Sequence, residues 1–214
     1  DKIDALNKKI QKKIDEQFEK SQKKIDAGKK KVESGKSSIS QGSEQLNSAI
    51  NQTMDQQKKL YKTEQDLKKQ LAELKKQKAS LEQIQTGIQT FMKSDAYTGI
   101  VTVLKDNPQL AESSEMQAQI KQVNAVVKKQ FSALSSLGIT VNTYEDLPAA
   151  SAEVGKLLTK VNTGMKTIER AQQKVESGKV SLASALDTLN ANASMTALQV
   201  SASSTELANA APSL

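Results

Sequence analysis

A seven-residue repeat that alternates large and small side chains constrains this 214-residue chain more than any other feature. In the first part of the sequence the large members are Phe18, Ile25, Val32, Ile39 and Leu46. The small members follow three residues behind them: Ser21, Gly28, Gly35, Gly42 and Ala49. Apolar residues at this spacing form one stripe along a helix, which is the pattern of a coiled coil. We therefore expect a long helix whose stripe packs closely against another helix.

The same repeat returns in the second half of the chain. Its large members are Val154, Val161, Ile168, Val175, Leu182 and Leu189, and its small members are Gly164, Ala171, Gly178 and Ala185. A glycine inside a helix costs about 0.8–1 kcal/mol relative to alanine, so close packing against a partner helix is the expected compensation. The alternative is that the glycines only soften a long helix. The close-packing seam is predicted at Gly28, Gly35, Gly42, Gly164 and Gly178.

Composition excludes several kinds of chemistry. The sequence contains no His, Cys or Trp, which removes a histidine base, a thiolate nucleophile, a Cys/His zinc site and disulfides. It also has no phosphate-binding loop, dinucleotide motif or EF-hand pattern. We expect no catalytic residues, no cofactor-binding or metal-binding residues and no nucleic-acid partner, and therefore a protein that is not an enzyme.

Charge is distributed unevenly along the chain. Of a formal net charge of +7, all the excess lies in the first half, and residues 1–36 contain 12 Lys against 7 acidic residues. This basic stretch is interpreted first as a solvated helix face, with contact to anionic lipid, wall polymer or nucleic acid as the alternative. The sequence has no run of eighteen apolar residues, so any membrane attachment is expected through flanking segments outside this chain.

Helix-breaking residues divide the sequence into three parts. Asn107-Pro108 marks the start of a helix, expected over about 109–137, which ends at Leu137-Gly138, and Leu147-Pro148 opens the next. We predict an all-α fold, an elongated antiparallel coiled-coil hairpin with a small helical tip. Its parts are an ascending arm at 1–93, a helical tip or head at 94–147 and a descending arm at 148–214.

The repeated segment Val-Glu-Ser-Gly-Lys, at 32–36 and again at 175–179, suggests how the arms align. If Gly35 faces Gly178, the chain reverses about residue 106, close to Pro108. A parallel homodimer is the competing geometry, because heptads alone do not distinguish the two. The tip holds most of the larger apolar groups, which either dock a protein partner or close the hairpin as a core. The predicted partner-binding residues are Phe91, Met92, Tyr97, Ile100, Val101 and Tyr144.

The repeats Ile-Asp-Ala-Gly-Lys at 25–29, Val-Glu-Ser-Gly-Lys at 32–36 and Ile-Ser-Gln-Gly at 39–42 resemble a known family pattern. They are similar to the extracellular coiled-coil insertions of Gram-positive FtsX-like (MacB-type) ABC transporter permeases, with the phage infection protein (YhgE/Pip) family as a second resemblance. The resemblance covers about a third of the chain. It implies a segment on the extracellular face of the cell membrane, with both ends returning to transmembrane helices and an ATPase subunit on the cytoplasmic side.

On this resemblance we expect an extracellular stalk of a permease that transmits membrane conformational change to a substrate or partner at its tip. A surface receptor or adhesin stalk that binds phage or host, or a type VII secretion membrane component, is the alternative. A cytosolic structural coiled coil is a further alternative, and it predicts a soluble parent protein.

Overall fold

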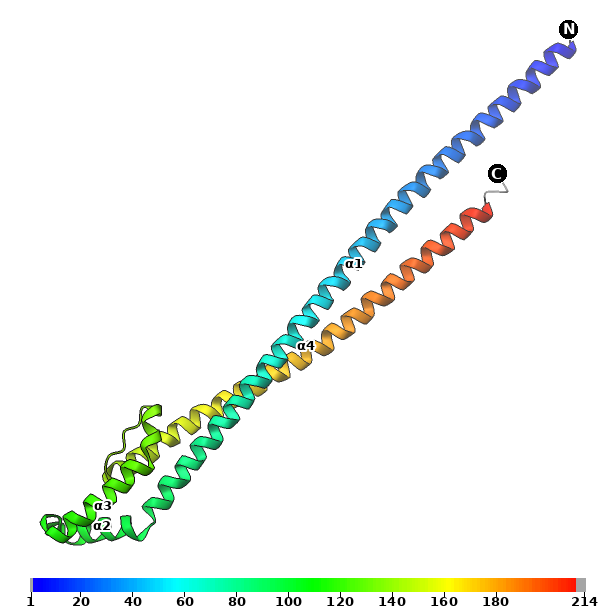
Figure 1. The fold of residues 1–214 in the computed structure, drawn as a ribbon. Helices are drawn as coiled ribbons and strands as arrows, with labels where there is room; N and C mark the ends of the chain where they lie inside the picture. The colour runs from blue at the N-terminus through cyan, green and yellow to red at the C-terminus, as the bar shows by residue number, and fades with distance from the viewer. Residues whose placement is uncertain (1, 211–214) are drawn as a thin grey trace. The chain divides into compact units, whose positions relative to one another are not determined.

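The computed structural model describes residues 2–210, and within that range the chain forms helices and no strand. Two long helices flank five shorter ones (Figure 1). In chain order they are α1 (Lys2–Met92), α2 (Asp95–Asp106), η1 (Pro108–Glu112), α3 (Ser114–Gln130), η2 (Ser132–Leu137), η3 (Tyr144–Asp146) and α4 (Leu147–Ala210), where η denotes a 3-10 helix. The prediction of an all-α fold built on two long antiparallel helices is confirmed.

Contacts divide the chain into two units. Unit 1 consists of Asp1–Leu60 and Ser177–Leu214, and unit 2 is the continuous segment Tyr61–Glu176. Both ends of the chain therefore belong to unit 1, whereas α2, α3 and the 3-10 helices belong to unit 2.

The short helices begin and end at residues whose side chains or backbones suit these positions. The Ser94 hydroxyl accepts a hydrogen bond from the Tyr97 N–H, and the Ser113 hydroxyl accepts one from the Met116 N–H. At the end of η2, Gly138 has φ of 77°, a left-handed conformation that favours glycine. The single helix expected over 109–137 is wrong, because Ser113 and Phe131 are not helical and divide the segment into η1, α3 and η2.

In unit 1, α1 and α4 pack through the heptad positions. Leu60 of α1 lies against Gly178 of α4, where a Cβ added to the glycine would be 3.1 Å from Leu60 Cδ1. Beyond this contact, partly buried residues continue along both helices at heptad-related spacing. On α1 they include Ile39, Gly42, Leu46, Ala49 and Thr53, and on α4 they include Leu182, Leu186, Leu189, Ala193 and Thr196.

In unit 2 the same arrangement of large against small recurs. A Cβ added to Gly164 of α4 would be 3.3 Å from Leu74 Cδ1 of α1. In an antiparallel pair of helices, the numbers of facing residues have a constant sum. Leu74 with Gly164 and Leu60 with Gly178 both give 238, so the two pairs follow one register whose midpoint falls at residue 119.

The predicted register, with Gly35 facing Gly178 and a reversal about residue 106, is therefore wrong. Gly178 faces Leu60, and no atom outside the backbone of α1 lies within 4 Å of a Cβ added to Gly35. The physical reason is packing, because two glycines facing each other leave a gap, whereas a leucine side chain fills the space above a glycine. The leucine stripe of α1 is thus the partner of the small residues of α4.

Candidate functional site

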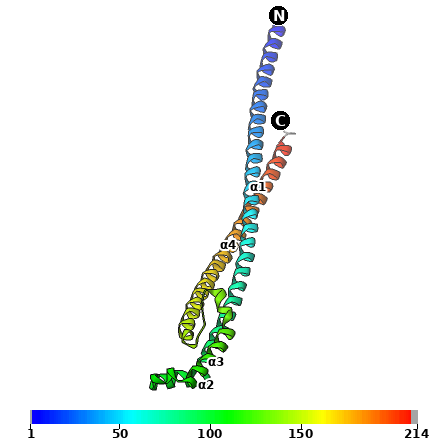
Figure 2. The ribbon, with the colours of Figure 1, turned by 60° about the vertical axis from the view of Figure 1, so that its left-hand side comes forward.

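The best-packed part of the molecule is the segment between α1 and α4, residues 93–146, which we call the cap. It lies wholly in unit 2, where α2, α3 and the loop after η2 pack against the end of α1 and the first turns of α4 (Figure 2). The cap's core is apolar, and Val127 and Leu134 are almost completely buried in it together with Ile88 of α1 and Leu147 and Val154 of α4. Burial of these side chains fixes the cap onto both long helices.

Four of the six aromatic residues of the chain form a continuous row through this core. Phe91 contacts Phe131 at 6.0 Å between ring centroids and Tyr97 at 6.4 Å, and Tyr97 contacts Tyr144 at 6.2 Å. All three contacts are edge-to-face, the geometry that the charge distribution of aromatic rings favours. The row ties the end of α1, α2, the end of α3 and η3 together.

Polar contacts hold the loop that leads into α4. The Asn124 side-chain oxygen on α3 accepts a hydrogen bond from the Tyr144 N–H at 2.9 Å. The Asp146 carboxylate accepts from the N–H groups of Asn142 at 2.8 Å and Thr143 at 2.9 Å. These backbone donors favour the charged carboxylate and lower the pKa of Asp146. These hydrogen bonds fix the conformation of the loop and therefore the direction in which α4 begins.

Two tyrosines in the cap have raised pKa values. Burial raises the pKa of Tyr97, because the phenolate form would lose its hydration. Burial also raises the pKa of Tyr144, and the neighbouring negative charge of Glu145 adds to the effect. Both hydroxyls therefore stay protonated at neutral pH, and the Tyr144 hydroxyl donates a hydrogen bond to Glu145 at 3.2 Å.

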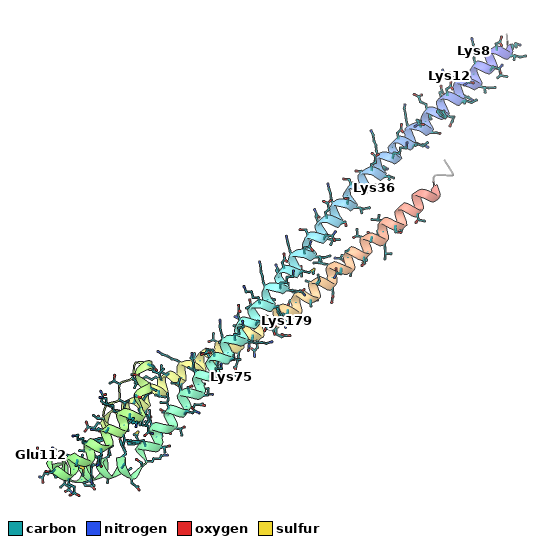
Figure 3. All side chains as sticks on the ribbon, viewed as in Figure 1. Lys8, Lys12, Lys36, Lys75, Glu112 and Lys179 are labelled. Carbon is teal, nitrogen blue, oxygen red and sulfur yellow. The ribbon has the colours of Figure 1, made fainter. Side chains whose placement is uncertain are left out.

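A groove of about 610 Å³ opens on the cap between α2, η1 and α3. Its apolar lining includes Ile100, Val103, Leu110, Met116 and Val123. Its polar lining includes two carboxylates, one at the start of α2 and one at the start of α3: Asp95 and Glu115. Glu112, the last residue of η1, is labelled in Figure 3. The groove thus combines an apolar floor with a negatively charged edge.

The residues predicted to bind a partner have different positions in the cap. Tyr97, Ile100 and Tyr144 are buried in the core, and Phe91, Met92 and Val101 are partly buried against it. Of these six residues only Ile100 lines the groove.

The other residues that line the groove were not among those predicted from the sequence. One signal for them is Leu110, an apolar residue two positions after a helix-starting proline, which is 41% exposed.

The five seam glycines also have different surroundings. Gly164 and Gly178 lie under leucine side chains of α1, as described above. Around Gly28, Gly35 and Gly42, no atom other than those of the local helix backbone lies within 4 Å of an added Cβ. Of the five predicted seam glycines, close packing therefore occurs at Gly164 and Gly178 of α4, and among the described residues nothing packs on Gly28, Gly35 or Gly42 of α1.

Comparison of the chain with protein-family models, curated proteins and solved structures gave no significant match. Among residues 2–210, no helix is both long and apolar enough to cross a membrane. The same range contains no group of three acidic side chains arranged to hold a metal ion.

Proposed function

We propose that this chain is the extracellular stalk domain of an ABC transporter permease, in which α1 and α4 transmit a change in the membrane to a partner bound at the cap. The observation that carries the proposal is the pairing of a leucine stripe on α1 with small residues on α4. Leu60 on Gly178 and Leu74 on Gly164 hold the two helices in one register along two separate parts of the chain.

Such a pair of helices suits transmission for two reasons. Both chain ends belong to unit 1, which is the topology that an insertion between two membrane-spanning helices needs. The cap locks onto α1 and α4 together through Ile88 and Leu147, so displacement of either helix acts on the cap core. A packed core resists gradual deformation and passes displacement on to its neighbours.

The groove is the surface of the cap that suits the partner. Its apolar floor accepts an aliphatic or aromatic side chain, and Asp95 and Glu115 favour a neighbouring Lys or Arg. This groove also supports the second candidate function, a surface receptor or adhesin stalk, in which the cap binds phage or host protein without transmitting movement.

A matched change of stalk length tests the proposal in the complete permease complex. Removing residues 60–66 together with 172–178 takes one heptad from each helix and keeps the remaining leucines on small residues. The stalk becomes shorter by about 10 Å, at 1.5 Å per residue. We expect the shortened permease to assemble with its ATPase subunit but to lose transport, because the cap no longer reaches its partner.

The control keeps the stalk at its full length but changes the same residues. Residues 60–66 are replaced by a copy of 67–73, and residues 172–178 by a copy of 165–171, which preserves the heptad positions. Transport should then remain close to that of the unaltered complex. A parent protein that does not assemble with an ATPase subunit contradicts the proposal. Intact transport with loss of phage or host binding in the shortened form favours the receptor function instead.

A further inference from the structure

The heptad pattern of α1 continues toward the N-terminus beyond the positions described above. Its heptad positions in residues 18–35 are Phe18, Ile25 and Val32 at the large places and Ser21, Gly28 and Gly35 at the small places. We call these six residues the N-terminal seam. Phe18 is 72% exposed and Val32 is 38% exposed, and the apolar residues that precede them are exposed as well: Ile3, Leu6, Ile10 and Ile14. Among the residues that the structure describes, this part of unit 1 is a helix whose apolar face is largely exposed, with Ile25 partly buried.

The N-terminal seam is continuous with an established interface. Counting by sevens from Phe18 along α1 leads through Ile39 and Leu46 to Leu60, which packs on Gly178. The same stripe is therefore covered by a helix at one end and exposed at the other. Since the covered part places a large residue on a small one, an occupant of the N-terminal seam should do the same.

Lysines border this seam on both sides. With the large residues at heptad position a, Lys24 and Lys31 stand at position g and Lys29 and Lys36 at position e, the two positions that flank a coiled-coil interface. The acidic residues of the segment, Glu19, Asp26 and Glu33, stand at position b, away from the seam. Figure 3 labels Lys36 and, nearer the N-terminus, Lys8 and Lys12 along this part of α1.

These charges decide between possible occupants. A second copy of the chain would bring lysine against lysine, because e faces e and g faces g in an antiparallel pair and g faces e in a parallel pair. A helix with acidic residues at its flanking positions would instead form attractive pairs with these lysines. Antiparallel orientation follows from continuity with α4, which pairs with α1 in that direction.

We propose that the N-terminal seam is a docking surface for an acidic helix of a partner protein. The partner helix runs antiparallel to α1, carries a small residue at every seventh position and has Glu or Asp at its e and g positions. This inference concerns a surface far along the sequence from the cap, and it stands or falls independently of the proposed stalk function.

Two synthetic helices serve as probes. The basic probe has the sequence of residues 18–45, and the acidic probe is the same peptide with Lys24, Lys29, Lys31 and Lys36 replaced by Glu. Both carry the large-and-small pattern, so they differ only in flanking charge. Fluorescence anisotropy with the full chain should show binding of the acidic probe at least about tenfold tighter than that of the basic probe. The difference should shrink as salt is added, because exposed charges are screened.

Paired variants of the full chain locate the site. Lys24→Glu with Lys31→Glu should weaken binding of the acidic probe by about tenfold. The control, Lys23→Glu with Lys30→Glu, makes the same change in net charge at position f, on the far side of the helix, and should alter binding by less than about twofold.

Two valine substitutions, one in the N-terminal seam and one outside it, test whether the seam requires small residues. Gly28→Val places a branched side chain in the seam and should weaken binding, whereas Ser34→Val at position c should not. An added Cβ at Gly28 meets no neighbouring atom in this chain, so the variant is expected to keep its helix content, which circular dichroism checks.

Four results overturn the proposal. The first is equal binding of the two probes, and the second is equal loss of binding in the seam variants and their controls. The third is tighter binding to vesicles containing phosphatidylglycerol than to the acidic probe, because the surface would then recognise anionic lipid. Dimerisation of the unaltered chain, detected by sedimentation and abolished by Gly28→Val, would identify a second copy as the occupant and would also refute the acidic partner.

Discussion

Replacing Gly178 with alanine measures how closely α1 and α4 pack in unit 1. In an open helix, Gly→Ala raises the free energy of unfolding by about 0.8–1 kcal/mol. At Gly178 the new Cβ would be 3.1 Å from Leu60 Cδ1, closer than the distance of about 3.5–4.0 Å at which carbon atoms attract most strongly. The leucine must move or change rotamer, which costs about 0.5–1.5 kcal/mol. We expect the two effects to offset each other, so that Gly178→Ala changes the free energy of unfolding by less than about 0.5 kcal/mol.

A second substitution separates the two effects. In a Leu60→Ala background the obstructing side chain is gone, and Gly178→Ala should regain the full helix-propensity gain of about 0.8–1 kcal/mol. Gly35→Ala is the matched control, because nothing obstructs its Cβ, and it should show a similar gain in the unaltered chain. The coupling energy between Leu60 and Gly178 should therefore be about 1 kcal/mol.

Urea denaturation followed by far-ultraviolet circular dichroism provides these free energies for the three single variants and the double variant. The reasoning is refuted if Gly178→Ala has the same effect with and without the Leu60 side chain. It is also refuted if Gly35→Ala stabilises no more than Gly178→Ala does in the unaltered chain, as a register with these two glycines face to face would require.

The chain has no cysteine, so an introduced pair of cysteines reports on the register directly. Leu60→Cys with Gly178→Cys should form a disulfide on mild oxidation, whereas Gly35→Cys with Gly178→Cys should not. Non-reducing electrophoresis distinguishes the two results. The lowered pKa of Asp146 means that its charged form stabilises the fold above the unfolded-state pKa of about 3.9, and that this contribution disappears as pH falls through the folded-state pKa. Asp146→Asn should therefore lower stability at neutral pH and weaken the dependence of stability on pH in the acid range, and an unchanged pH profile would contradict this. Among the residues that the structure describes, the Gln85 side-chain oxygen is buried without a hydrogen-bond partner. Gln85→Leu should therefore raise the free energy of unfolding by about 1 kcal/mol, measured by urea denaturation. A loss of stability would show that this oxygen accepts a hydrogen bond in the folded protein.

Two of the helix boundaries followed from local features of the sequence. Gly138 ends η2 in the left-handed conformation, and the Leu147-Pro148 pair opens α4, both as expected. Proline fits the first turn of a helix because its missing N–H has no partner there in any case. Such positions can be predicted because the residue's own backbone preference determines them.

The register could not be predicted in the same way, because it depends on which surfaces fill each other. The repeated segment around Gly35 and Gly178 suggested that like faces like. Packing instead places unlike residues together, with Leu74 on Gly164 and Leu60 on Gly178. The leucines of α1 were visible in the sequence as a helical stripe, but nothing local in the sequence assigned them to the small residues of α4.

The groove on the cap could not be predicted from local sequence features either. The aromatic residues predicted to bind a partner contact one another, with Tyr97 between Phe91 and Tyr144, because buried rings stabilise the core best when they pack together. The residues left at the surface, such as Leu110 and Glu115, are ordinary in type, and only the arrangement of α2, η1 and α3 makes them a groove.

The seven-residue spacing of the seam has a further consequence for movement. Leu60 lies on Gly178 and Leu74 on Gly164, and small residues recur on α4 at 164, 171, 178 and 185. A slide of seven residues that brought Leu60 to Ala185, Leu67 to Gly178 and Leu74 to Ala171 would again place leucines on small residues. A slide of four residues in the same direction would instead bring these leucines to Leu182, Val175 and Ile168. The helix pair therefore favours discrete positions about 10 Å apart rather than a continuous range. The core of unit 2, which contains Ile88 of α1 and Leu147 of α4, fixes one of these positions.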